Sequence, residues 1–120
     1  MTLTVDQQKL IEGNNIVVLA TANKYGQPRA VLVEVNVVQG NKIVVTDNQM
    51  NITSQNIVEN PLVSLLAFNK DYSSFLRISG RAMHYTDQSH IDWAASLETN
   101  KNWEPKGVIE IIIDNVEESR

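Results

Sequence analysis

The stretch "NIVVLATANKYGQPRAVLVEVNVVQGNKIVVTD", residues 15–47, decides the fold. Its β-rich runs at 16–22, 29–38 and 42–46 are separated by "NKYGQP", a turn with a glycine and a proline, and by "QGNK", a tight hairpin signal. Strands joined by such short turns pair antiparallel. The stretch therefore predicts a three-stranded antiparallel meander.

The middle strand of this meander partly alternates between apolar and polar residues, which is typical of a strand with one face toward a core. One predicted face carries Val31, Val33, Val35 and Val37, and the other carries Glu34 and Asn36 together with Leu32 and Val38.

A short helix is predicted before the meander, over residues 5–12. Thr4 and Gln7 have the spacing of a capping box, in which each side chain satisfies a free backbone N–H near the other. Gly13 and Asn14 are predicted to end this helix, because both tolerate the left-handed conformation that is common at helix ends.

The elements predicted after the meander complete a barrel. They are a helix over 53–59, strands over 62–68 and 75–85, a helix that starts at Thr86 or Asp87 and runs to about residue 98, and a strand over 107–114. Asn60-Pro61 ends the first of these helices, and Gly80 is expected to mark a bulge or a bend. About six short strands and three helices predict a mainly β fold, an antiparallel barrel with flanking helices. Side chains fill so small a barrel, so a ligand is expected outside, in a groove or at a subunit interface.

Composition narrows the class of protein. A chain of 120 residues predicts one domain, residues 1–120, and the absence of cysteine excludes disulfide scaffolds, thiolate metal sites and thiol catalysis. A net charge of −4 disfavours nucleic-acid binding. We find neither a signal peptide nor an apolar run long enough to span a bilayer, so we expect a soluble, cytoplasmic protein. Nucleophile elbows, phosphate-binding Walker loops and dinucleotide-binding glycine motifs are absent from the sequence.

A group of short polar residues lies between the end of the third predicted strand and the start of the next helix, in "VVTDNQMNITSQNI", residues 44–57. Asn51 or Thr53 would cap the helix under the simpler interpretation. Under the other, this corner holds a phosphorylated ligand, because the first turn of a helix presents unsatisfied N–H groups and a partial positive charge. The pattern alone leaves both open.

Trp103 and two histidines complete the candidates. Trp103 precedes the last predicted strand, where it would stack on a flat ligand, anchor an interface or fold over the core. His84 and His90 have no second histidine or cysteine at ligand spacing, so we interpret them as ordinary structural histidines and expect no metal site.

The motifs together resemble the pyridoxamine 5'-phosphate oxidase-like split barrels, especially their short FMN-binding members. The likeness rests on "VVLATANKYGQPRAV", "GNKIVVTDNQMNITSQNIVENPLVSLLAF", "ISGRAMHYTD" and "NWEPKGVIEI", whose order and spacing span nearly the whole chain. The resemblance implies a six-stranded antiparallel split β-barrel and a homodimer with FMN in grooves between the subunits.

The resemblance also implies where FMN would lie. The phosphate would sit at the strand-to-helix corner, near residues 50–53. The isoalloxazine ring would lie along residues 31–34 of the second strand and the turn at residues 46–48, and the tryptophan would approach from the partner subunit. The implied cofactor-binding residues are Arg29, Val31, Leu32, Val33, Glu34, Thr46, Asp47, Asn48, Met50, Asn51, Ile52, Thr53 and Trp103. No residue is assigned as catalytic acid, base or nucleophile.

The chain departs from the family pattern at two charged positions. Ile52 stands where the family commonly has lysine, and Glu34 stands near a lysine of the larger oxidases. Each charge-assisted contact to phosphate contributes about 1.5–3 kcal/mol, so losing one weakens binding roughly ten- to a hundredfold. The helix amides and Thr53 remain, so FMN binding is expected to be weakened but kept.

The leading hypothesis is a small homodimeric FMN-binding flavoprotein acting in electron transfer or as a flavin reductase, without pyridoxamine oxidase activity. The alternative is a split-barrel dimer that has lost FMN and acts as a binding or structural module. A third hypothesis is a different ligand, a deazaflavin or haem. The histidines give haem little support, and a deazaflavin would require basic residues that this groove lacks.

Overall fold

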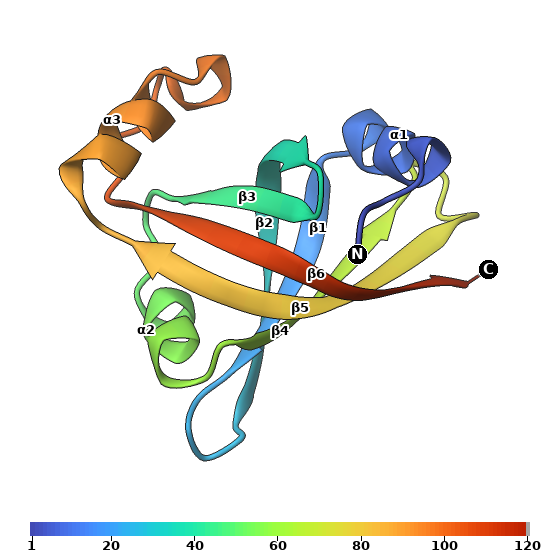
Figure 1. The fold of residues 1–120 in the computed structure, drawn as a ribbon, viewed down its shortest axis with the longest axis horizontal. Coiled ribbons are helices and arrows are strands. Elements are labelled where there is room, and N and C mark those ends of the chain that lie inside the picture. Colours follow the sequence, from blue (N-terminus) through green and yellow to red (C-terminus); the bar gives the residue numbers. More distant parts are fainter. Residues whose placement is uncertain (120) are drawn as a thin grey trace.

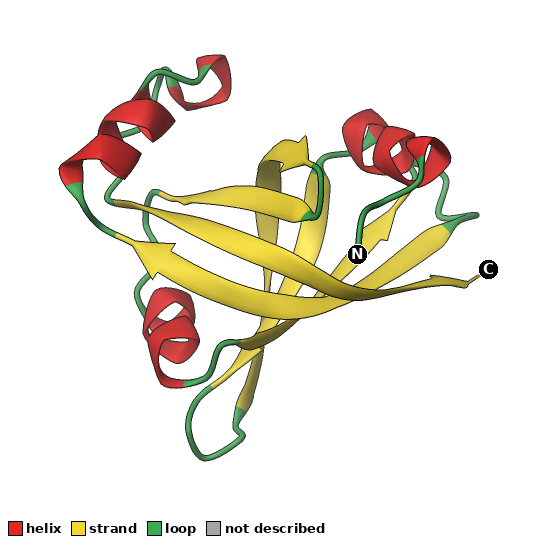
Figure 2. Cartoon of the chain, in the orientation of Figure 1, coloured by secondary structure: helices red, strands yellow, loops and turns green. Residues whose placement is uncertain are grey.

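The computed structural model describes residues 1–119, which form a closed antiparallel β-barrel with short helices around it (Figures 1 and 2). In chain order the elements are α1 (Val5–Gly13), β1 (Ile16–Ala22), β2 (Pro28–Gln39), β3 (Lys42–Asp47), α2 (Ile52–Glu59), β4 (Leu62–Phe68), β5 (Phe75–Tyr85), α3 (Gln88–Ala95), a 3-10 turn (Glu98–Asn100) and β6 (Gly107–Ser119). The strands close in the order β1-β2-β3-β6-β5-β4. The predicted fold class is confirmed, as is the β1-β2-β3 meander.

The barrel interior is a side-chain core. Its largest fully buried members come from every strand except β2 and include Leu19, Ile43, Leu65, Ile78 and Ile111. From β2, Val33 and Val35 join the same buried cluster. Because the interior is filled, a ligand has to bind outside the barrel.

The faces of β2 change at a bulge, which corrects the predicted alternation. Val35 pairs with Val45, but the next pair is Val37 with Val44, so one extra residue, Asn36, stands in β2. An extra residue reverses the facing of every later side chain. Val37 therefore packs with the small cluster under α3, and Val38 packs against the barrel core instead.

The bulge predicted at Gly80 is also present. The β5–β6 register shifts between Ser79 and Gly80, and a Cβ at Gly80 would collide with the backbone oxygen of Ile112. Only glycine allows the two strands to approach this closely.

The helix ends differ from the sequence prediction in two places. α1 includes Gly13 and stops at Asn14 in an extended, not left-handed, conformation. α3 ends at Ala95 and not near residue 98, because Ser96 Oγ donates to the Trp93 carbonyl and Asn100 Nδ2 to the Ala94 carbonyl. These side chains take carbonyls that a longer helix would use.

β6 is longer than the predicted 107–114. Its pairing with β5 continues to Ser119, opposite Phe75. The polar "NVEES" segment lacks an apolar face that would have indicated a strand, and tertiary pairing with β5 overrides that weak local signal.

Candidate functional site

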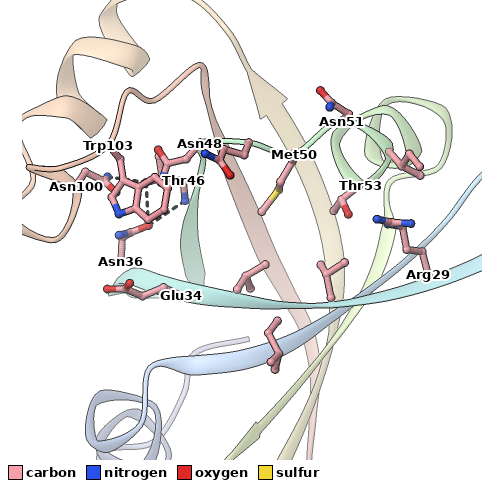
Figure 3. A pocket seen from close by; sticks show the side chains of 15 residues that line it. Arg29, Glu34, Asn36, Thr46, Asn48, Met50, Asn51, Thr53, Asn100 and Trp103 are labelled. Atoms are coloured by element: carbon pink, nitrogen blue, oxygen red, sulfur yellow. Dashed lines mark hydrogen bonds between the residues drawn. The ribbon is translucent and has the colours of Figure 1, made fainter.

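A cavity of about 480 Å³ opens on the side of the barrel between β2, the β3–α2 turn and the loop before β6 (Figure 3). Ligand pockets in proteins are typically about 300–1,000 Å³, so a cofactor-sized molecule fits. Among the residues predicted from the resemblance, those that line it are Arg29, Val31, Leu32, Val33, Glu34, Thr46, Asn48, Met50, Asn51, Ile52, Thr53 and Trp103. Asn36, Gln49 and Asn100 also line it and were not predicted.

The cavity exists because β2 and β3 separate along part of their length. Backbone pairing of β2 with β3 begins only at Val35, whereas residues 28–34 of β2 pair with β1 alone among the described residues. Asn36 ends the β2–β3 ladder, since its Oδ1 accepts from the Thr46 N–H at 2.9 Å and from Thr46 Oγ1 at 2.8 Å. A side chain thereby replaces the next backbone partner of β3.

The freed edge of β2 presents backbone polar groups to the cavity. The Val35 N–H donates to the Asn15 carbonyl at 2.8 Å, so the backbone groups of Val35 point toward β1. Backbone groups alternate in direction along an antiparallel strand. Those of Leu32 and Glu34 therefore point away from β1, to the unpaired edge beside the cavity.

One end of the cavity is the N-terminus of α2. Asn51 stands at the N-cap position, but its side chain makes no capping hydrogen bond, and its Oδ1 accepts from Lys106 Nζ at 3.0 Å. Within residues 1–119 we find no acceptor for the N–H groups of residues 52–54. The capping interpretation of Asn51 and Thr53 is therefore wrong, and the partial positive charge of the helix end is left open.

The side chains beside this helix end are mixed. Arg29 reaches it from β2 and lies near Thr53, and Met50 points into the cavity (Figure 3). Ile52, in place of a family lysine, is 52% exposed and does not fill the cavity.

Asp47 is the predicted site residue that the structure places elsewhere. Its carboxylate is fully buried on the far side of the β3–α2 turn, where Oδ1 accepts from the Met50 N–H at 2.9 Å and Oδ2 lies 2.8 Å from His84 Nε2. A Cβ on Gly107 would stand 2.7 Å from His84 Nε2, so glycine there leaves room for this pair. Asp47 and His84 thus hold the β3–α2 turn by hydrogen bonds on the side that faces away from the large cavity.

The other end of the cavity is covered by the loop that carries Trp103. Asn100 is buried and donates through Nδ2 to Thr46 Oγ1 and to the Ala94 carbonyl, both at 2.9 Å. The Trp103 N–H donates to the Asn100 carbonyl at 2.9 Å. Within the single chain the indole lines the cavity, close to Asn36 and Glu34 (Figure 3). The approach from a partner subunit that the resemblance implied stays a prediction.

One buried polar atom in the cavity wall has no partner. Asn48 Oδ1 is shielded from solvent and accepts no hydrogen bond from any described residue. Buried polar atoms are nearly always hydrogen-bonded, so this acceptor needs a hydrogen bond that the described residues do not supply.

Other titratable groups have local roles. His90 pairs with Asp87 at 2.7 Å and stacks on Tyr85, with ring centroids 4.3 Å apart. Hydrogen bonds from Ser89 and then from His90 hold the pKa of Asp87 well below its usual range. Both histidines serve as structural partners of a carboxylate, and no group of three metal-ligating side chains occurs in residues 1–119.

The missed residues differ in how far the sequence could have indicated them. Val37 and Val38 are adjacent after Asn36, and this break in the alternation of apolar and polar residues was the available signal for a bulge. Asn100 lies in a polar loop with no motif, and its role arises from contacts with Thr46, which is far away in the sequence.

The profile of the family described as pyridoxamine 5'-phosphate oxidase matches residues 3–120. The chain belongs to this family. Protein MJ0282 of Methanocaldococcus jannaschii is 33% identical over an alignment 120 residues long, gaps included. The alignment covers 95% of this chain and 78% of that protein.

Solved structures show how widely the fold of this family member is shared. HupZ of Group A Streptococcus is similar with a TM-score of 0.85 and 19% identity, covering 97% of this chain and 93% of HupZ. An FMN-binding protein from Syntrophomonas wolfei has a TM-score of 0.73 and 12% identity over 97% and 90% of the two chains. An F420 reductase is similar with a TM-score of 0.75 and 17% identity, covering 96% of this chain and 98% of the reductase chain. In the part of the chain that the structure describes, every helix is too short or too polar to cross a membrane.

Proposed function

We propose that this protein is a small homodimeric FMN-binding flavoprotein that acts in electron transfer or as a flavin reductase. The observation that carries the proposal is the cavity itself, with an uncapped helix end at one side and a freed β-strand edge under an indole at the other. The family and the FMN-binding protein of Syntrophomonas wolfei support it.

The residues present fit FMN at both ends. The N–H groups of residues 52–54, the Thr53 hydroxyl and the Arg29 guanidinium would hold the phosphate, which helix N-termini bind well. The freed backbone groups of Leu32 and Glu34 and the orphaned Asn48 Oδ1 would meet the polar edge of the isoalloxazine ring.

The apolar surfaces fit the flat ring between these ends. Val31, Val33 and Met50 line the cavity from the barrel side, and Trp103 lies at the ring end. When bound, FMN would supply hydride and single-electron chemistry. The protein would orient the ring, shield it from water and set its hydrogen bonds.

The homodimer is supported by an apolar row on the outside of the barrel. Val18 on β1 pairs with Leu32 on one side and with Leu66 on the other, so the three form a continuous row across β2, β1 and β4. Leu32 is 69% exposed and also borders the cavity, so a second copy on this row would lie beside the ligand. Val18 and Leu66 are half-buried, and an apolar patch of this kind on a surface is typical of an interface.

Two alternatives rest on specific observations. Glu34 and Ile52 favour a dimer that has lost FMN, although Ile52 leaves the cavity open. The fold likeness to an F420 reductase raises a deazaflavin ligand, but Arg29 is the one cationic side chain lining the cavity in the described residues, which gives an acidic tail little to bind.

The test is a titration of the purified protein with FMN. Its two readouts are the visible spectrum of the flavin and the melting temperature of the protein. We expect a dissociation constant in the micromolar range or below and a higher melting temperature, since a ligand that binds the native state stabilises it. No spectral change and no thermal shift would leave the cofactor-free module as the better account.

The dimer has a separate test by light scattering. Leu32→Glu, on the apolar row, is expected to give monomers, whereas Val5→Glu on the exposed start of α1 keeps the dimer. Monomers in the unsubstituted protein would contradict the homodimer.

A further inference from the structure

The side chain of Asn51 is turned away from the helix that it begins. An asparagine at the N-cap normally accepts from the N–H of the second or third helical residue, here Thr53 or Ser54. Instead its Oδ1 meets Lys106 Nζ at 3.0 Å, and in Figure 3 the Asn51 side chain points away from Thr53 and Arg29. A good capping residue is therefore present, but its side chain is bonded to Lys106, and its backbone (φ −122°, ψ −62°) lies outside the extended conformation of the capping residues Thr4 and Asp87.

Lys106 is held in place on the far side of the β3–α2 turn. Its backbone N–H donates to the Asp47 carbonyl at 2.9 Å, and its Nζ lies 3.9 Å from Asp47 Oδ1. Lys106 lines a second cavity together with Asp47, Asn51 and His84, and does not line the larger one. Its ammonium would therefore touch Asn51 without touching a ligand in the larger cavity.

We propose that Lys106 is a positioning residue that keeps the first amides of α2 free for a phosphate by holding the Asn51 side chain on the other side of the turn. This inference rests on the proposed FMN site. Two arrangements compete for Asn51: in one its side chain is bonded to Lys106, and in the other its backbone turns to the extended conformation and its side chain caps α2. Without Lys106 the capped arrangement is favoured, and a phosphate then has to displace the cap.

The expected effect follows from the strength of a cap. A side-chain cap shifts its equilibrium by roughly fivefold. A ligand that binds only the uncapped arrangement loses apparent affinity by the fraction that is capped. We therefore expect Lys106→Met to weaken FMN binding about fivefold, and Lys106→Arg, which keeps a donor, to restore it.

A double-substitution design separates this mechanism from the loss of a charge. Asn51→Gly removes the side chain that could cap, and glycine is itself a tolerated N-cap. In the Asn51→Gly background, Lys106→Met is expected to change FMN affinity by less than about twofold, because no cap can form. Lys101→Met, which removes an exposed lysine paired with Glu98, is the charge control and should leave affinity unchanged.

The closing experiment measures FMN affinity and, in the protein without FMN, amide hydrogen exchange at Thr53 and Ser54. We expect Lys106→Met to slow exchange at one of these amides about fivefold, because the amide gains an Asn51 acceptor. Equal affinity losses with and without Asn51, or unchanged exchange, would overturn the inference. If slowed exchange were found in a protein that binds no FMN, the Asn51 arrangement would stand and the proposed function would fail.

Discussion

Two kinds of helix start occur in this molecule. α1 and α3 are capped by their own N-cap residues, since Thr4 Oγ1 accepts from the Gln7 N–H at 3.2 Å and Asp87 Oδ2 from the His90 N–H at 3.2 Å. The start of α2 is held from outside, by Asp47, His84 and Lys106, which come from three different places in the chain. Among the helices in residues 1–119, α2 alone has its N-terminus in the wall of the large cavity.

This difference shows how the fold separates stability from binding. A local cap satisfies the helix amides and thereby leaves nothing for a ligand. The Asp47 carboxylate, itself paired with the distant His84 and Lys106, fixes the turn before α2 while leaving the amides of residues 52–54 open. The predictions below change one kind of start and use the other as the control.

The largest expected effect is on the buried support of α2. His84→Leu removes the partner of a fully buried carboxylate, which should lower the free energy of unfolding by about 2–3 kcal/mol. His90→Leu removes the corresponding histidine–aspartate pair at α3, which is partly exposed, and should cost less than about 1 kcal/mol. Urea unfolding measures both, and equal losses would contradict the distinction.

Next comes the charge at the first helical residue. Ile52→Lys adds a cation beside the open amides and should tighten FMN binding roughly ten- to a hundredfold. Val5→Lys makes the same change at the first residue of α1, which is also exposed, and should leave FMN affinity unchanged. Fluorescence titration compares them, and an unchanged affinity for Ile52→Lys would place the phosphate elsewhere.

The sequence predicted the starts of α1 and α3, which are capped locally, better than the start of α2. The capping side chains of Thr4, Gln7 and Asp87 each accept from a backbone N–H three residues away, so short-range chemistry predicts them. The barrel was predicted for the same reason, because tight turns determine which strands pair.

Apart from the local bond of the Met50 N–H to Asp47, the contacts at the start of α2 join residues that lie far apart in the sequence. Lys106 lies 55 residues after Asn51, and no pattern in "EPKG" indicates that its ammonium reaches the helix start. The cavity residues came from the family resemblance, which named Asp47 as readily as its neighbours, although burial turns its carboxylate away from the cavity.

A smaller effect concerns the caps themselves. Thr4→Ala should lower the free energy of unfolding by about 1 kcal/mol, because the Gln7 N–H loses its acceptor. Asn51→Ala should cost only about 0.5 kcal/mol, since its side chain caps nothing and its bond to Lys106 is exposed. Chemical denaturation of the two variants is the measurement, and a full capping loss at Asn51 would show that it caps α2 in solution.

The smallest expected effect is on acid titration at the start of α3. The hydrogen bond from Ser89 is the main cause of the lowered pKa of Asp87, so Ser89→Ala should raise that pKa toward the ordinary value of about 4. A lowered pKa in the folded state contributes stability above the unfolded value and loses it as the pH falls through the folded one. In the variant this loss is therefore smaller and is complete at a higher pH. Carboxyl-carbon NMR from pH 5 to 2 follows it, and an unchanged midpoint would refute the assignment.

The most direct test of the account follows the backbone amide signals of α1, α2 and α3 by NMR during titration with FMN and, separately, with riboflavin, which lacks the phosphate. The account predicts that FMN shifts the signals of residues 52–54 strongly while riboflavin does not, and that the capped starts at Val5 and Gln88 respond to neither. Equal shifts with both ligands at residues 52–54, or no shift there when FMN binds, would contradict it.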